Sequence, residues 1–280
     1  MHMIPTTPKL KTPLGACDTH MHFYDTNVPS ALGGPPLPGN FTVPMYRELQ
    51  RKLGLQRVIV VQPNAYRADN RVTLDAIRAL APNAKGVGVV TPEVSDAEIE
   101  RLTQGGIVAQ RFFQLPNAAV GFDRMDQIMA RVHPFGWHAN LQLDGRELPK
   151  YETQIKRLPG KFVIDHVGKF LEPVPPEHEA FKALLRLVDT GRCWVKLSAP
   201  YEVSKNGAPK YEDVGRLAKA LVKHAPERML WASNWPHPGA PKDQMPDDAN
   251  LLDLLLDWAP DNATRNKILV DNPAELYGFS

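Results

Sequence analysis

The chain has 280 residues, of which 43% are hydrophobic and 23% charged, so it is a globular protein large enough to fold without disulfide or metal staples. Its 33 Lys and Arg residues nearly balance 31 Asp and Glu residues, which argues against a nucleic-acid partner because such binders carry a clustered basic excess. No uncharged apolar run approaches the roughly 20 residues of a membrane helix, and the N-terminal segment lacks the apolar core of a secretory signal, so we expect a cytoplasmic protein with no membrane partner.

Eight short segments predict buried strands. They are apolar and rich in β-branched residues, and several are apolar on both faces, as strands of a helix-covered parallel sheet should be. Cys17 and Cys193 fall in two of them, and two cysteines make no disulfide framework. The predicted strands cover residues 15–22, 57–62, 86–90, 107–113, 138–143, 162–168, 193–199 and 228–235.

Helical patterns occupy the intervals between these strands. Asn70 is the expected N-cap of one helix, and Ser95 followed by Glu98 predicts a capping box at the start of another. The predicted helices cover residues 46–53, 70–80, 95–104, 125–132, 151–158, 180–188, 214–224 and 251–258, with a helical tail over 263–276.

Eight strand-then-helix units without a composition break predict an α/β fold, a single (β/α)8 TIM barrel formed by one domain over residues 1–280. A doubly wound open sheet is the alternative. It usually has fewer strands, and no G-x-G-x-x-G follows the first strand to support it. The oligomeric state stays open.

Polar side chains follow each predicted strand, and the carboxyl ends of the strands carry the active site in such barrels. His20 and His22 are two residues apart on the first strand, so both imidazoles enter the barrel mouth from the same face. His166 ends the sixth strand and is the third candidate, whereas we expect its neighbour Asp165 to face away from it. Neutral imidazoles serve as metal ligands or as hydrogen-bonding and proton-transfer groups.

Arg111 ends the fourth strand, where a buried guanidinium needs a partner. A substrate carboxylate would suit its bidentate fork, and a structural ion pair is the alternative. Lys196 in the seventh strand allows the same two interpretations. Asn234 follows the eighth strand and faces the mouth, while His237 is either a ligand-facing donor or a support for its loop.

These residues belong to a longer pattern that resembles a known family. The segments GACDTHMHFYD, VIVVQPNAYRADNRVTLDAI, RFF, FVIDHVGK, VKLSAPYE, WASNWPHP and DNPAELYGF occur in this order along nearly the whole chain. They resemble the 2-pyrone-4,6-dicarboxylate lactonase branch of the amidohydrolase superfamily. The resemblance implies an amidohydrolase-like barrel and an enzyme that acts on a lactone.

The metal-ligand positions depart from the pattern of that superfamily. Its usual metal sites add a Lys or Glu from the fourth strand and a His from the fifth, where this chain has Arg111 and Gln142. Neither is a good ligand, because Arg stays protonated and Gln is a weak neutral donor. The lactonase branch is similar in lacking these ligands and is thought to work without metal. We therefore predict no required metal and no other cofactor.

The residue that serves as the hydrolytic base in the lactonases is also absent. They have Asp where this chain has Asn234, and an amide cannot act as a general base. Lys169 and Glu202 stand where the lactonases have arginines, whereas Arg111 can still hold one carboxylate. A hydroxyl of the substrate itself then becomes the best nucleophile, because it reacts at high effective molarity.

The resulting prediction is a metal-independent lactone isomerase that resembles the aldarolactone isomerases of this branch. It would convert an aldaric 1,5-lactone carrying a free carboxylate, such as D-galactaro-1,5-lactone, to the 1,4-lactone, a reaction of galacturonate catabolism. His20 and His22 would polarise the carbonyl, His166 would carry the proton, Asn234 would orient the substrate and Arg111 would bind the carboxylate. The second-rank candidates for substrate contacts are Gln142, Lys196, Ser198, Asn64 and His237.

Three other functions remain open. The first is a lactonase that hydrolyses a sugar lactone or a 2-pyrone-4,6-dicarboxylate-like lactone, with His237 as a candidate base in place of Asn234. The second is a zinc or manganese hydrolase or decarboxylase from the wider superfamily. The third is a sugar-acid binding protein without catalytic activity, although the mouth holds more histidines than binding alone requires.

Overall fold

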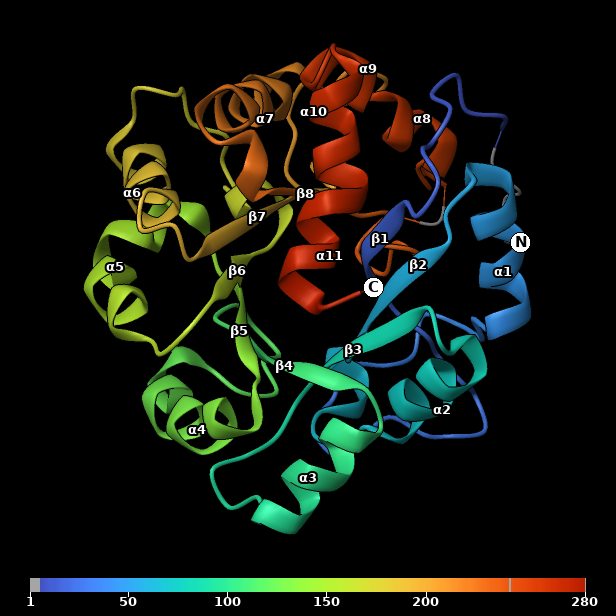
Figure 1. Cartoon of the computed structure of the whole chain (residues 1–280), viewed down its shortest axis with the longest axis vertical. Helices are drawn as coiled ribbons and strands as arrows, with labels where there is room; N and C mark the ends of the chain where they lie inside the picture. The colour runs from blue at the N-terminus through green and yellow to red at the C-terminus, as the bar shows by residue number, and fades with distance from the viewer. Residues whose placement is uncertain (1–5, 242, 280) are drawn as a thin grey trace.

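The computed structural model describes residues 6–241 and 243–279 as a ring of eight parallel strands surrounded by helices (Figure 1). The strands pair in chain order, each with the next one along the sequence, which confirms the predicted (β/α)8 barrel. Their bounds are β1 Cys17–Met21, β2 Arg57–Val61, β3 Ala84–Gly88, β4 Ile107–Phe113, β5 His138–Gln142, β6 Phe162–Ile164, β7 Cys193–Leu197 and β8 Met229–Trp231.

One principal helix follows each of the first seven strands, and four short helices follow the last. Their bounds are α1 Val43–Leu53, α2 Arg71–Leu80, α3 Asp96–Gln104, α4 Met125–Val132, α5 Leu148–Arg157, α6 Glu179–Val188, α7 Glu212–His224, α8 Asp248–Asp253, α9 Leu255–Trp258, α10 Asn262–Asn266 and α11 Asn272–Tyr277. Among the described residues, none of these helices combines the length and the apolar character needed to cross a bilayer.

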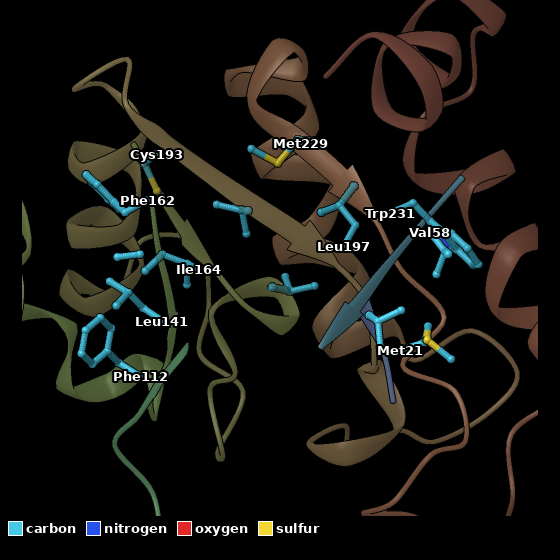
Figure 2. Packing of buried hydrophobic residues seen from close by; sticks show 14 of the residues in the cluster. Met21, Val58, Phe112, Leu141, Phe162, Ile164, Cys193, Leu197, Met229 and Trp231 are labelled. Atoms are coloured by element: carbon cyan, nitrogen blue, oxygen red, sulfur yellow. The ribbon is translucent and has the colours of Figure 1, made fainter. Parts of the chain in front are cut away.

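Two apolar layers hold the barrel together. In β2, Val58 and Val60 belong to the outer layer between strands and helices, whereas Ile59 and Val61 belong to the inner layer, as the period of two in a strand requires. Figure 2 shows part of the outer layer, with side chains of β1, β2 and β4 to β8. Leu276 and Tyr277 of α11 complete the inner layer, and α11 lies over the middle of the ring in Figure 1.

The barrel closes between β1 and β8 through direct hydrogen bonds. The backbone N–H of Asn234 donates to the carbonyl of His20 at 2.9 Å, and the N–H of His22 donates to that of Trp235 at 2.8 Å. Asp18 accepts hydrogen bonds from the Ser233 N–H at 3.0 Å and from its hydroxyl at 2.5 Å. This closure brings the histidines of the first strand next to the loop that carries Asn234.

The third strand differs from its prediction. It spans Ala84–Gly88 instead of 86–90, because the N–H groups of Val89 and Val90 donate to side chains and not to a neighbouring strand. Asn70 stands at the predicted N-cap position of α2, but its side chain accepts the Val89 N–H and makes no capping hydrogen bond. The predicted Ser95 cap is confirmed, since its hydroxyl accepts the Glu98 N–H at 3.2 Å.

The C-terminal helical predictions are correct in type. The helix predicted over 251–258 divides into α8 and α9. The tail predicted over 263–276 is helical throughout, since α10, a π-helical turn over Lys267–Asp271 and α11 follow one another without a gap. Pro273 in the first turn of α11 lacks the N–H of a regular helix, and the π-helical turn stands directly before α11.

Candidate active site

A cavity of about 830 Å³ opens at the carboxyl ends of the strands, where the sequence predicts the site. The loop over residues 35–41 and the turn over 236–240 form its rim. The predicted site residues that line it are His22, Asn64, Arg111, Gln142, His166, Asn234 and His237. The other three, His20, Lys196 and Ser198, do not line the cavity but contact residues that lie beside or beneath it.

His20 and His22 meet through their ring nitrogens, with the two Nε2 atoms 3.2 Å apart. The Nδ1 of His22 lies 2.8 Å from the carbonyl of Val61, so Nδ1 carries the proton and Nε2 is the acceptor. His20 therefore donates from its own Nε2. Burial lowers the pKa of His22 to about 3, with Arg111 as the second cause, and burial also lowers the pKa of His20 well below its usual value. Both rings are neutral at pH 7.

A buried lysine fixes the tautomer of His20. The Lys196 Nζ lies 3.1 Å from the His20 Nδ1, 2.8 Å from the Asn140 Oδ1 and 3.1 Å from the Asp165 Oδ1. The lysine and the carboxylate are both fully buried. Because an ammonium only donates, His20 must accept at Nδ1 and carry its proton at Nε2. Lys196 thus contacts protein groups on all sides and is not placed to bind a substrate hydroxyl, the role expected of it.

Asp165 belongs to this cluster, which corrects the expectation that it faces away from the site. Its Oδ1 lies 3.3 Å from the His20 Nδ1, and its Oδ2 accepts from Asn140 at 2.8 Å. Burial alone would raise the pKa of Asp165, but Lys196 holds it well below its usual value. Val163 belongs to the inner layer and Asp165 has an extended backbone, so the alternation of β6 turns Asp165 inward, whereas His166 reaches the cavity because its φ is 55°.

The ligand atoms of His20, Asp165 and His166 lie within 4.8 Å of one another, which is close enough for a metal ion. The charges do not fit one. The Lys196 ammonium lies 3.1 Å from both the His20 imidazole and the Asp165 carboxylate, so these groups already have a positive charge beside them. A divalent ion beside that ammonium would face direct repulsion.

His166 lines the cavity and contacts Ser198, with Nδ1 and Oγ 2.8 Å apart. A serine hydroxyl donates or accepts, so it suits either neutral tautomer of the ring. The Nε2 of His166 can then be a donor or an acceptor in turn. Burial lowers the pKa of His166 well below its usual value, so the neutral ring is the resting state. These are the properties of a group that accepts a proton from one oxygen and returns it to another.

Arg111 binds backbone and amide oxygens and leaves part of its fork without a protein partner. It donates to the carbonyl of Gln62 at 2.8 Å and to the Gln142 Oε1 at 3.0 Å, while its buried Nε has no hydrogen-bond partner. Among the described residues no carboxylate lies within ion-pair distance of this guanidinium. The geometry therefore favours a ligand carboxylate over a structural ion pair as its counter-ion.

A second lysine–carboxylate pair lines the opposite part of the cavity and was not among the predicted site residues. Lys169 forms an ion pair with Glu202, whose Oε1 accepts from the Asn234 Nδ2 at 3.1 Å. The same amide nitrogen donates to the Tyr201 hydroxyl at 2.8 Å. That hydroxyl lies 3.0 Å from the His237 Nδ1, and the His237 Nε2 lies 3.1 Å from Asp248. His237 therefore supports Tyr201 and Asn234 from below while it also lines the cavity.

Strained backbone conformations cluster after β6, β7 and β8. Non-glycine residues with positive φ are rare, and a β-branched one such as Val167, at 55°, is a clear outlier. Such strain persists only where surrounding structure enforces it, and it concentrates at functional sites. The positive-φ residues close to the ends of β6, β7 and β8 are His166, Val167, Lys169, Ala199, Asn234 and His237.

Comparison with known proteins agrees with this architecture. The amidohydrolase family model matches residues 17–279. The chain is 37% identical over 278 residues to a D-galactarolactone isomerase of Agrobacterium fabrum, covering 98% of this chain and 95% of that one. It is 33% identical over 287 residues to a 2-pyrone-4,6-dicarboxylate hydrolase of Comamonas testosteroni, covering 98% and 93%. A solved apo structure from Agrobacterium tumefaciens superposes with a TM-score of 0.95 at 35% identity over 99% of both chains. With its barrel, its mouth histidines and these matches, the chain belongs to the amidohydrolase family.

Proposed function

We propose that this protein is a metal-independent lactone isomerase, which converts an aldaric 1,5-lactone such as D-galactaro-1,5-lactone to the 1,4-lactone. The observation that carries the proposal is the cavity itself: Asn234 stands there without basic character, beside the proton-carrying His166 and across from the uncompensated Arg111. The similarity to a D-galactarolactone isomerase over nearly the whole chain supports the same reaction. We place the reaction in the cytoplasm, in the catabolism of a sugar acid such as galacturonate.

The reaction exchanges one ester oxygen for another within the substrate. The C4 hydroxyl attacks the C1 carbonyl, a new C1–O4 bond forms and the C1–O5 bond breaks, so no water is consumed. His166 takes the proton from the attacking hydroxyl at Nε2 and returns it to the departing O5. Its contact with Ser198 accommodates both steps. Holding both groups in one bound molecule supplies the high effective molarity that this attack needs.

The remaining groups hold the substrate in place. Arg111 binds the free carboxylate with the donor capacity that Gln62 and Gln142 leave unused. Asn234 accepts a hydrogen bond from a substrate hydroxyl at Oδ1, because its Nδ2 is already engaged by Tyr201 and Glu202. The His20–His22 pair forms a neutral wall, in which His22 faces the cavity and His20 lies behind it.

Hydrolysis of a lactone is the second candidate, because relatives of similar identity are lactone hydrolases. It needs a base for water, and the candidate base in place of Asn234 is poorly available. The Nδ1 of His237 lies against the Tyr201 hydroxyl and its Nε2 lies 3.1 Å from Asp248. The Nδ1 is therefore engaged by Tyr201, and the buried Nε2 faces Asp248 without a hydrogen bond.

Proton NMR of D-galactaro-1,5-lactone with chelator-treated enzyme tests the proposal. We expect the 1,4-lactone to accumulate before any open diacid, at a rate proportional to enzyme concentration and unchanged by added Zn²⁺ or Mn²⁺. Direct appearance of the diacid would make the protein a hydrolase. Activity only after metal is added back would overturn metal independence.

A further inference from the structure

The orientation of the Asn234 amide follows from its two partners. An ionised carboxylate only accepts hydrogen bonds, so the group that faces the Glu202 Oε1 at 3.1 Å must be the amide nitrogen. The second hydrogen of that nitrogen goes to the Tyr201 hydroxyl at 2.8 Å. The Tyr201 hydroxyl can accept it because its own hydrogen points to the His237 Nδ1, 3.0 Å away. Only the acceptor Oδ1 of Asn234 remains for a ligand.

Glu202 is firmly held as an anion. Its side chain is 11% exposed and paired with Lys169, whose side chain is equally buried. Burial alone would raise the pKa of Glu202, but Lys169 lowers it below its usual value. The chain also packs closely over it, since a Cβ added at Gly239 would lie 3.1 Å from the Glu202 Oε1. A permanent negative charge thus stands next to residue 234.

We propose that Glu202 is the residue that fits this site to an amide at position 234. It aims the Asn234 Oδ1 at the substrate hydroxyl, and its charge opposes a second carboxylate at position 234, the group that hydrolysis would need. The inference deepens the proposed function and rests on it. Glu202 is a positioning and specificity-determining residue, whereas the proton of the reaction moves through His166.

A direct consequence is that Asn234 and Glu202 act as a matched pair. In Asn234→Asp, two carboxylates would stand about as close as the present 3.1 Å contact. Like charges at such a distance raise the pKa of one of them by about one to three units, so the introduced aspartate would take up its proton at a higher pH than an ordinary aspartate. Removing the charge of Glu202 as well should restore an ordinary carboxylate at position 234.

Four variants test the pair: Asn234→Asp, Glu202→Gln, the double variant of both, and Asn234→Asp with Asp144→Asn. Asp144 is a matched control, because it follows β5 at the same end of the barrel and pairs with Arg146 instead of position 234. In the double variant we expect the pKa of the introduced aspartate to be at least about one unit lower than in Asn234→Asp alone. A ¹³C NMR titration of labelled aspartates measures it, with the new signal assigned by its absence from wild type.

The pH dependence of hydrolysis provides the second readout. Diacid formation from D-galactaro-1,5-lactone should fall to half of its plateau at a pH at least about one unit lower in the double variant than in Asn234→Asp, because the aspartate that acts as base is protonated at a lower pH. The Asp144→Asn control should behave like Asn234→Asp in both measurements. Should Glu202→Gln unfold the protein, Lys169→Met/Glu202→Gln removes the ion pair as a unit and allows the same comparison.

Equal pKa values for the introduced aspartate with and without Glu202 would overturn the inference. Equal pH midpoints for hydrolysis would do the same. The titration needs no substrate, so it decides the pairing even if the wild type isomerises no lactone. That last result would overturn the proposed function alone.

Discussion

Two lysine–carboxylate pairs flank the histidines of this barrel, and they differ in what they can reach. Lys196 and Asp165 lie 3.1 Å apart with fully buried side chains, and they contact His20 and Asn140. Lys169 and Glu202 are each 11% exposed and line the cavity beside Asn234. The inner pair is therefore part of the protein interior, whereas the outer pair lies at the wall of the cavity.

The difference indicates two uses of the same chemistry. The inner ammonium fixes the proton of His20 on Nε2, and through His20 it settles the hydrogen-bonding pattern of His22. Glu202 neutralises the charge of Lys169, so the Arg111 guanidinium remains available to a substrate carboxylate. We therefore expect the inner pair to control stability and tautomer, and the outer pair to control which substrate binds and which reaction follows.

Breaking the inner pair should have the largest effect on stability. Lys196→Met leaves the buried Asp165 without its cation, and we expect a loss of about 3–5 kcal/mol in the free energy of unfolding, measured by urea titration. Lys196→Met/Asp165→Asn, which removes both charges, should regain much of this loss. Lys169→Met is the matched change in the outer pair, and because that pair faces the cavity it should cost clearly less. Equal losses in the two single variants would contradict the distinction.

Replacing His166, the proposed proton carrier, should have the largest effect on turnover. His166→Gln keeps polar character but cannot accept and return a proton, so kcat should fall by about two to four powers of ten. Ser198→Ala is the control: it removes one neutral hydrogen bond, worth about 1 kcal/mol, and should reduce kcat by about tenfold or less. A comparable loss in both variants would mean that His166 has only a positioning role.

A smaller effect is expected when Arg111, the proposed partner of the substrate carboxylate, is replaced. Arg111→Met should lower kcat/KM by about 10- to 150-fold, because a charge-assisted hydrogen bond is worth about 1.5–3 kcal/mol. The methyl ester of the lactone lacks the carboxylate, so wild type and variant should differ little on it. An equal loss on acid and ester would show that Arg111 supports the site and does not read the carboxylate.

The sequence predicted the parts of this site that follow strand periodicity. His20 and His22 stand on β1 or directly after it, Arg111 on β4 and Gln142 on β5, and the alternation of a strand is sufficient to aim these side chains inward. Periodicity fails beyond the strand ends. Alternation from the inward Val163 would turn His166 outward, and His166 lines the cavity only because its φ is 55°.

The outer pair could not be found by the same reasoning. Lys169 and Glu202 are 33 residues apart and meet only because the turns after β6 and β7 take left-handed backbone conformations at Lys169 and Ala199. Such conformations are unusual for these residue types, so local sequence gives no sign of them. The sequence did mark both positions, since Lys169 and Glu202 stand where the lactonase pattern has arginines. It did not indicate that the two residues form an ion pair.

The smallest expected effect is on the pH dependence of stability, and it arises from a buried histidine that lies outside the cavity. His138 lies on β5 against the Tyr277 ring, away from the cavity, and burial lowers its pKa to about 3, with Lys196 and Lys161 as further causes. The unfolded chain takes up this proton near pH 6.5, whereas the folded protein does not until about pH 3. Stability from this group is therefore complete above pH 6.5 and falls as the pH drops toward 3.

His138→Gln should remove that dependence without changing isomerase activity. Between pH 6 and 4, the variant should lose stability less steeply than wild type, by up to about 1.4 kcal/mol per pH unit, as measured by urea unfolding at each pH. Asp18 acts in the opposite sense, since burial raises its pKa to about 6 and its contribution is lost as the pH rises through that value. Asp18→Asn should therefore steepen the acid loss that His138→Gln reduces. Parallel slopes in all three proteins would mean that neither group is held in its buried protonation state.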